Sequence, residues 1–228
     1  MTFMVVALFL LQFFVVVECL NYEMVMDRRK AILGTVGASL MTTTIPNGVS
    51  NAFANDIPEW TLEGGVQMPT LALNTVGLST EDTERAIQLA VEEGITHLDF
   101  HPGKERDGVA RYLQNYGRKN LFLNTKIRKA PPGTSPKEAA ERTKKQIDED
   151  LKVLGVDSVD MLMLRDSPDC EVIQAQWAIL EEALSLGKTR SVGVINFCES
   201  ALFCLLSTAK IKPALNYYMY VINKSKYC

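Results

Sequence analysis

The segment "QIDEDLKVLGVDSVDMLML", residues 146–164, decides the fold, because it joins a long helical pattern to an apolar strand. The helical pattern starts near residue 137 and stops at Gly155, a residue type that commonly ends helices. The strand that follows, 158–165, is mostly apolar instead of alternating, which is typical of a parallel strand buried on both faces. The segment therefore predicts one helix-to-strand unit of an α/β protein.

The same alternation of strands and helices continues in both directions from this segment. Helical patterns separate predicted strands at 71–77, 96–100, 121–127, 158–165, 189–196 and 214–220. A small hairpin is expected around Gly64 and Gly65, and Thr80 is expected to cap the first helix. This order predicts parallel strands covered by helices, either as an open doubly wound sheet or as a (β/α)8 barrel. No dinucleotide-binding G-x-G-x-x-G loop follows the first strand.

Composition indicates a globular chain of 228 residues, 47% hydrophobic and 22% charged, which suffices for the core of one large domain. The net charge of −3 is too small to indicate a nucleic acid or an anionic membrane as partner. The cysteines are odd in number and include no C-x-x-C pair, so neither a metal site nor a disulfide is expected. They are Cys19, Cys170, Cys198, Cys204 and Cys228.

Residues 1–54 are interpreted as a leader region, and the folded domain is expected over 55–228. Residues 1–17 are uncharged, a length that suits a signal-peptide core better than a bilayer span. Arg28 and Arg29 then precede a milder apolar run in the manner of a twin-arginine export signal. The leader predicts an exported or organellar protein, for example in the thylakoid lumen of a plastid, that meets membranes only through this leader. A single N-terminal anchor is the plainer alternative.

Six segments, in the same order and at similar spacing, resemble the aldo-keto reductases over roughly residues 60–220. The resemblance implies an incomplete (β/α)8 TIM barrel of about six βα strands, with an N-terminal β-hairpin at its bottom. It also implies NADP(H) as cofactor and hydride transfer to an aldehyde or ketone. The segments are "GGVQMPTLALNT", "GITHLD", "LFLNTKI", "QIDEDLKVLGVDSVDMLML", "LEEALSLGKTRSVGVINF" and "KPALNYYMY".

The last two strands of the family's barrel are not matched, and we therefore expect a C-terminally truncated barrel. The family's loop that grips the cofactor's 2′-phosphate is not matched either, so NADP(H) binding is expected to be weakened or lost. A six-stranded arc would present two unpaired strand edges, which a partner chain would cover.

Two of the family's four catalytic residues are matched by Asp99 and Lys126. The resemblance implies that Lys126 pairs with Asp99, although the two could equally form a mutually compensating buried pair without catalytic use. The family's tyrosine has no counterpart, because residues 102–104 are Pro, Gly and Lys. His101, whose imidazole ring can carry a proton, is either a substitute proton donor or a loop histidine bonded to the backbone.

Arg165 stands where the family carries its catalytic histidine. An arginine there either polarises a carbonyl or binds a carboxylate-bearing substrate through a bidentate pair. The alternative is an ion pair with Asp166 or Asp169, which would make Arg165 a structural residue.

Four further positions are implied to contact the cofactor. Thr75 matches a threonine near the nicotinamide ribose, and Asn196 matches the asparagine of a Ser-Asn-Phe turn in which Ile195 replaces the serine. Asn216 stands where the family holds the carboxamide. Tyr217 would either stack beneath the nicotinamide ring or serve as a core aromatic.

Three functions remain open from the sequence. The first is an NADP-dependent reductase that acts on a small carbonyl substrate. The second is a catalytically inactive relative that binds a nucleotide or a protein. The third is a truncated copy without independent function.

Overall fold

The computed structural model describes residues 57–218, and the predicted leader over 1–54 lies outside these residues. A two-stranded antiparallel hairpin, β1 (Glu59–Thr61) and β2 (Gln67–Pro69), comes first. Six parallel strands follow: β3 (Ala72–Asn74), β4 (His97–Phe100), β5 (Phe122–Lys126), β6 (Val159–Arg165), β7 (Thr189–Ile195) and β8 (Asn216–Tyr217). The helices between them are α3 (Thr80–Glu92), α4 (Lys104–Tyr116), α5 (Pro136–Leu154), α6 (Cys170–Ser185) and α7 (Glu199–Leu206).

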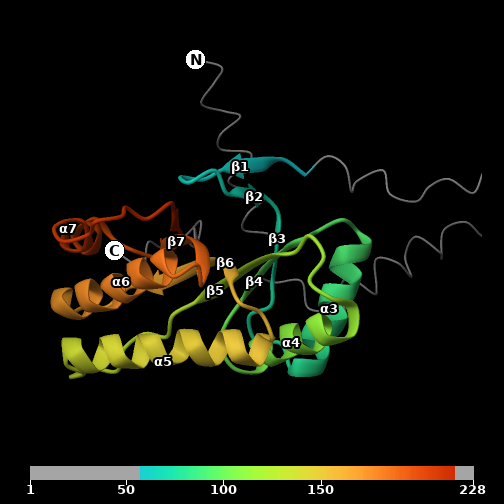
Figure 1. Cartoon of the computed structure of the whole chain (residues 1–228), viewed down its shortest axis with the longest axis horizontal. Helices are drawn as coiled ribbons and strands as arrows, with labels where there is room; N and C mark the ends of the chain where they lie inside the picture. Colours follow the sequence, from blue (N-terminus) through green and yellow to red (C-terminus); the bar gives the residue numbers. More distant parts are fainter. Residues whose placement is uncertain (1–56, 219–228) are drawn as a thin grey trace, which may run out of the picture.

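The six strands lie side by side in chain order, which is the arrangement of a (β/α)8 barrel. A doubly wound sheet would reverse its strand order at a switch point, and no reversal occurs here. The sheet curls into a half-barrel with α5 and α6 along its outer side and the hairpin on the other side (Figure 1). The predicted incomplete barrel with an N-terminal hairpin is therefore confirmed. Within residues 57–218, β3 and β8 each pair along one edge only.

The four central strands, β4 to β7, are buried on both faces along most of their length, because alternate side chains point to the helices and to the barrel interior. The outer set packs against the helices and includes Leu98, Leu123, Leu164 and Val194, with Trp177 of α6 among the fully buried residues. The inner set joins hairpin side chains to strand side chains and comprises Leu62, Val66, Met68, Phe122, Met161, Met163 and Ile195. The hairpin thus closes the bottom of the half-barrel.

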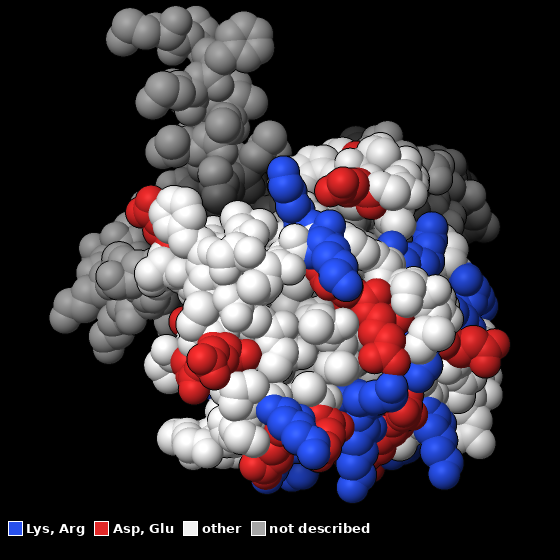
Figure 2. Space-filling model, turned by 60° about the vertical axis from the view of Figure 1, so that its left-hand side comes forward, with Lys and Arg blue, Asp and Glu red and all other residues white. Residues whose placement is uncertain are grey.

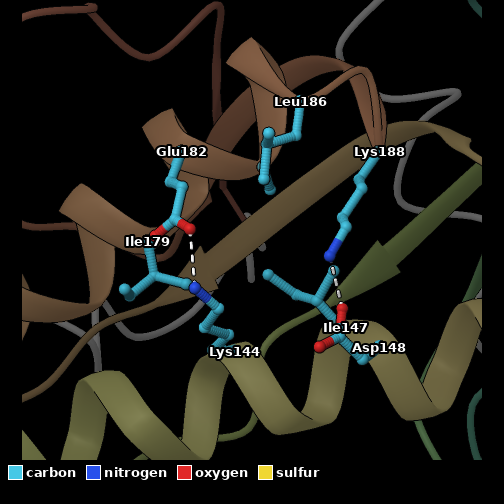
Figure 3. Close-up of a pocket in the computed structure, with 8 residues that line it drawn as sticks. Lys144, Ile147, Asp148, Ile179, Glu182, Leu186 and Lys188 are labelled. Carbon is cyan, nitrogen blue, oxygen red and sulfur yellow. Dashed lines mark hydrogen bonds and ion pairs between the residues drawn. The ribbon is translucent and has the colours of Figure 1, made fainter.

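The seam between α5 and α6 is apolar inside and charged at its rim (Figure 3). Ile147 and Ile179 face each other across it. Ion pairs join Lys144 to Glu182 at 2.7 Å and Lys188 to Asp148 at 2.5 Å. Exposed pairs of this kind contribute little stability, so burial of the apolar side chains holds the two helices together.

The first helix begins one residue earlier than expected, and the second packs closely against it. Ser79, not Thr80, is the N-cap of α3, and its hydroxyl accepts the Asp82 N–H at 3.1 Å. Helix α4 passes very close to α3 at Gly108, where a Cβ atom would lie 2.5 Å from Thr83 Cβ and 2.6 Å from the Thr80 carbonyl oxygen. Only glycine permits this approach of the two backbones.

The expectation that the cysteines form no disulfide is wrong. Cys170 at the start of α6 is bonded to Cys204 in α7, with Cα atoms 5.7 Å apart. The two residues are 34 positions apart, and only the packing of α7 against α6 brings them together, so no spacing motif signals the bond. Among the described helices, none combines the length and apolar character needed to cross a bilayer.

Candidate active site

Polar side chains gather inside the mouth of the half-barrel, at the carboxyl ends of four neighbouring strands. Asn74 of β3 stands in register with Asp99 of β4, and Lys126 and Arg165 are the last residues of β5 and β6. Active sites of (β/α)8 barrels lie at this end of the strands. The mouth is therefore polar, whereas the bottom of the interior is apolar.

A buried ion pair forms the centre of this constellation. The Lys126 ammonium contacts a carboxylate oxygen of Asp99, and the two residues are 1% and 3% exposed. Asp99 also accepts hydrogen bonds from the amides of Asn74 at 2.7 Å and Asn124 at 3.0 Å. Burial lowers the pKa of Lys126, and the negative charge of Asp99 opposes this effect.

Arg165 lies near enough for its positive charge to lower the pKa of Lys126 further. Within the described residues it makes no ion pair with Asp166 or Asp169. Asp169 instead caps α6 by accepting the N–H groups of Glu171 and Val172 at 3.0 and 3.3 Å. The guanidinium is half-buried at the mouth, beside the cationic end of Lys126.

Glu105, in the first turn of α4, connects two of the predicted residues. Its carboxylate accepts hydrogen bonds from the Thr75 hydroxyl at 3.1 Å, the Gly77 N–H at 3.1 Å and the His101 N–H at 3.0 Å. The His101 ring nitrogen Nδ1 lies 2.9 Å from the same carboxylate. Burial raises the pKa of Glu105, but the bonds from His101 and Gly77 outweigh burial, so the pKa is lowered.

The His101 ring is thus held by a carboxylate and not by a backbone carbonyl. Nδ1 is the nitrogen that faces Glu105, which leaves Nε2 as the nitrogen not engaged by that carboxylate. The ring is partly accessible, with 17% of the side chain exposed. The arrangement is a histidine–glutamate dyad, and the negative charge of Glu105 acts on Lys126, whose pKa it raises against the effect of burial.

The predicted cofactor residues differ in the hydrogen bonds and packing contacts that they make within the protein. The Thr75 hydroxyl donates to Glu105, and both the donor and the acceptor of the Asn216 amide are bonded to the Phe197 backbone, at 2.9 and 3.3 Å. Asn196 adopts a left-handed conformation with φ 58°, and its N–H donates to the Tyr217 carbonyl at 2.9 Å. Tyr217 is half-buried against the apolar cluster of the interior.

Four residues of the site region escaped prediction. Asn74 and Asn124 are detectable in principle, because they lie on the interior face of strands whose neighbours carry Asp99 and Lys126. Glu105 carries no such signal, since its position depends on how the chain turns after β4. His97 fixes the hairpin below the site, with Nδ1 2.8 Å from the Pro69 carbonyl oxygen, and burial lowers its pKa.

Fold and site together define a (β/α)8-barrel protein with a buried carboxylate–lysine pair at its catalytic end. A model of the Aldo/keto reductase family matches residues 67–225. The chain therefore belongs to the aldo-keto reductase family.

Relatives support this assignment at moderate identity. Morphine 6-dehydrogenase of Pseudomonas putida is 31% identical over 167 residues, which cover 72% of this chain and 54% of that protein. Aldo-keto reductase AKR2E4 of Bombyx mori is 28% identical, over 68% of this chain and 55% of that protein. The chain thus spans about half the length of the curated relatives it matches.

Solved structures agree with the described fold. The aldo/keto reductase of Brucella melitensis superposes with a TM-score of 0.64 at 26% identity, covering 71% of this chain and 62% of that one. The Bombyx mori enzyme AKR2E4, solved in complex with NADP, gives a TM-score of 0.57 at 26% identity, over 71% and 57% of the two chains.

Proposed function

We propose that this protein reduces a small aldehyde or ketone with NADPH, and that His101 supplies the proton in place of the family's tyrosine. The observation that carries the proposal is the buried Asp99–Lys126 pair at the catalytic end of the barrel, with the His101–Glu105 dyad beside it. Membership of the aldo-keto reductase family and the relative solved with NADP support the choice of cofactor.

Carbonyl reduction needs a hydride and a proton, and NADPH supplies the hydride when bound. His101 in its protonated form donates the proton from Nε2 to the oxygen that gains negative charge. Glu105 acts as a positioning residue, since it holds Nδ1 and balances the charge of the imidazolium. Lys126 and Arg165 place positive charge near the same oxygen, where it stabilises the developing negative charge.

Arg165 selects the substrate in this proposal. Its guanidinium is the cation at the mouth without an ion pair inside residues 57–218, in contrast to Lys126, which is paired with Asp99. A guanidinium binds a carboxylate in a bidentate manner. We therefore expect carbonyl compounds that carry a carboxylate, such as 2-keto acids, to be better substrates than simple aldehydes.

The test is oxidation of NADPH by the full chain with a keto acid and with a simple aldehyde. His101→Gln is expected to lower kcat about 100-fold. Glu105→Gln is expected to have a smaller effect and to shift the pH profile of kcat/KM. Arg165→Lys is expected to raise KM for the keto acid and to leave KM for the aldehyde unchanged. A rate that is unaffected by His101→Gln would eliminate the proposed donor.

Nucleotide binding without turnover is the second candidate function. It is favoured by the segment that follows Asp99, because residues 100–111 contain no tyrosine to act as the family's proton donor. The increase in NADPH fluorescence on binding measures this activity separately from oxidation. Binding without oxidation of any carbonyl compound would favour the second candidate over the first.

A further inference from the structure

A hydrogen-bonded network between α4 and α5 joins the two parts of the candidate active site. It starts at the His101 carbonyl oxygen, which accepts the Arg106 N–H at 3.1 Å. The Arg106 guanidinium donates to one carboxylate oxygen of Asp150 at 2.8 Å. The other oxygen accepts the Gln146 amide at 3.0 Å, and the same amide donates to the Lys126 carbonyl at 2.9 Å. We call the three side chains of Arg106, Asp150 and Gln146 the brace.

The ion pair within the brace differs from most others in its burial. Figure 2 shows Lys and Arg side chains interspersed with Asp and Glu side chains over one face of the molecule. The side chains of Arg106 and Asp150, in contrast, are only 9% and 5% exposed. Within residues 57–218, only the Lys126–Asp99 pair is buried to a similar degree on both sides. Removing two charges from water costs free energy, so a buried pair is weak evidence for a stabilising role and suits a role in fixing geometry.

At one end of the brace, Gln146 holds the end of strand β5. Its amide nitrogen donates to the Lys126 carbonyl, and its amide oxygen accepts the Arg128 N–H, at 2.9 Å each. Lys126 follows Thr125, the last residue of β5 that pairs with β4. The backbone of Lys126 is therefore supported by a side chain of α5 at the point where its ammonium enters the buried pair with the aspartate of β4.

At the other end of the brace, Arg106 holds the turn that presents His101. Glu105 and Arg106 are neighbours in the first turn of α4, but their side chains bind different partners. The Glu105 carboxylate contacts the His101 ring, whereas the Arg106 guanidinium contacts Asp150 of α5. Asp107 accepts two further bonds from the guanidinium, at 2.8 and 3.0 Å. Acceptors on both helices thus fix the guanidinium, and through it they anchor the turn to α5.

We propose that the brace is a positioning network that fixes the histidine–glutamate dyad relative to the buried lysine–aspartate pair. Its effect on turnover rests on the function proposed above. The brace contributes no reacting atom, because it acts through the backbone of His101 and Lys126. Proton transfer to a carbonyl oxygen requires both parts of the site in one geometry, and a displacement of about 1 Å can cost on the order of 100-fold in rate.

The experiment is oxidation of NADPH by the full chain with a 2-keto acid, in the wild type and in Gln146→Met. Methionine keeps the length of the side chain but makes none of the three hydrogen bonds. We expect kcat to fall about 10-fold and KM to stay within about twofold, because no substrate contact is removed. In a His101→Gln background the same substitution should change kcat by less than about twofold, since the donor that it positions is gone.

Gln174→Met is the matched control. Gln174 of α6 donates to the Cys204 carbonyl at 3.0 Å and to the Ser207 hydroxyl at 3.1 Å, so this variant removes bonds between helices outside the brace. It should leave kcat unchanged. An unchanged kcat in Gln146→Met, or an equal fall in both variants, would overturn the proposal. Thermal unfolding is measured beside the kinetics, and if Gln146→Met fails to fold, the isosteric Asp150→Asn decides, with the same expected fall in kcat.

A second measurement does not depend on turnover. The chain contains two histidines, so the imidazole NMR signals of the full chain are assigned with His97→Gln and His101→Gln. Gln146→Met should shift the His101 signal more than Gln174→Met does. Equal shifts in the two variants would refute the brace whether or not the protein reduces a carbonyl compound. A larger shift in Gln146→Met, in a chain that oxidises no NADPH, would support the brace and contradict the proposed function.

Discussion

Lys126 is paired with Asp99 across two neighbouring strands, and both side chains are buried at the mouth of the half-barrel. Asp99→Asn leaves the ammonium buried without a counter-charge. We expect the free energy of unfolding to fall by about 3 kcal/mol, as for other broken buried pairs. Urea unfolding at neutral pH measures this loss. The double variant Asp99→Asn, Lys126→Met is the control and should recover most of it; no recovery would show that the pair is not the cause.

Acidification should weaken the fold through His97. Burial lowers its pKa from the usual 6.5, and the neutral ring bonds to the Pro69 carbonyl. Because the unfolded chain takes up the proton at higher pH, the contribution of His97 is complete above pH 6.5 and is lost as the pH falls below it.

Urea unfolding at a series of pH values tests this expectation. The stability difference between wild type and His97→Gln should shrink below pH 6.5, by at most about 1.4 kcal/mol per pH unit. A difference that stays constant or grows on acidification would contradict the assigned direction of the pKa shift.

Gly108→Ala should destabilise the protein although alanine favours helices. The new Cβ would meet Thr83 Cβ and the Thr80 carbonyl oxygen at distances that force α3 and α4 apart. Strain of this kind costs about 2 kcal/mol, which exceeds the roughly 1 kcal/mol that alanine contributes in a helix. Thermal unfolding of the variant measures this loss. Lys104→Ala, at an exposed position of the same helix, is the control and should change stability by less than about 0.5 kcal/mol in the same measurement.

The Cys170–Cys204 disulfide should contribute about 3 to 4 kcal/mol, because it closes a loop of 34 residues in the unfolded chain. Cys170→Ser, Cys204→Ser and the double variant should all lose the same amount in unfolding without reductant, since each removes the same bond. Additive losses in the double variant would mean that each cysteine stabilises the fold by packing instead.

More of the fold than of the candidate site could be predicted from the sequence. Alternation of apolar strands with helices predicted the parallel sheet, and the order of the six segments selected the barrel. Asp99 and Lys126 were placed together correctly because barrel strands in register bring their carboxyl ends together. Their surroundings were harder to predict, because Asn74 looks like any polar residue at a strand end.

Contacts that depend on turns and on helix packing could not be predicted from patterns in the sequence. His101 was expected to act alone or to contact the backbone, but the turn after β4 brings Glu105 to its ring. The disulfide was missed for a similar reason, since it depends on where α7 lies against α6. Such contacts depend on a few backbone angles, which composition and periodicity do not report.

The hairpin that closes the bottom of the half-barrel has a consequence for the order in which parts of the chain fold. Leu62 of the hairpin shares one cluster with Ile195 of β7, so segments from opposite ends of the described chain must meet there. Contacts so distant in sequence form late, after the local strand–helix units have collapsed. We therefore expect the half-barrel to stay open at its bottom until the N-terminal hairpin packs beneath the strands.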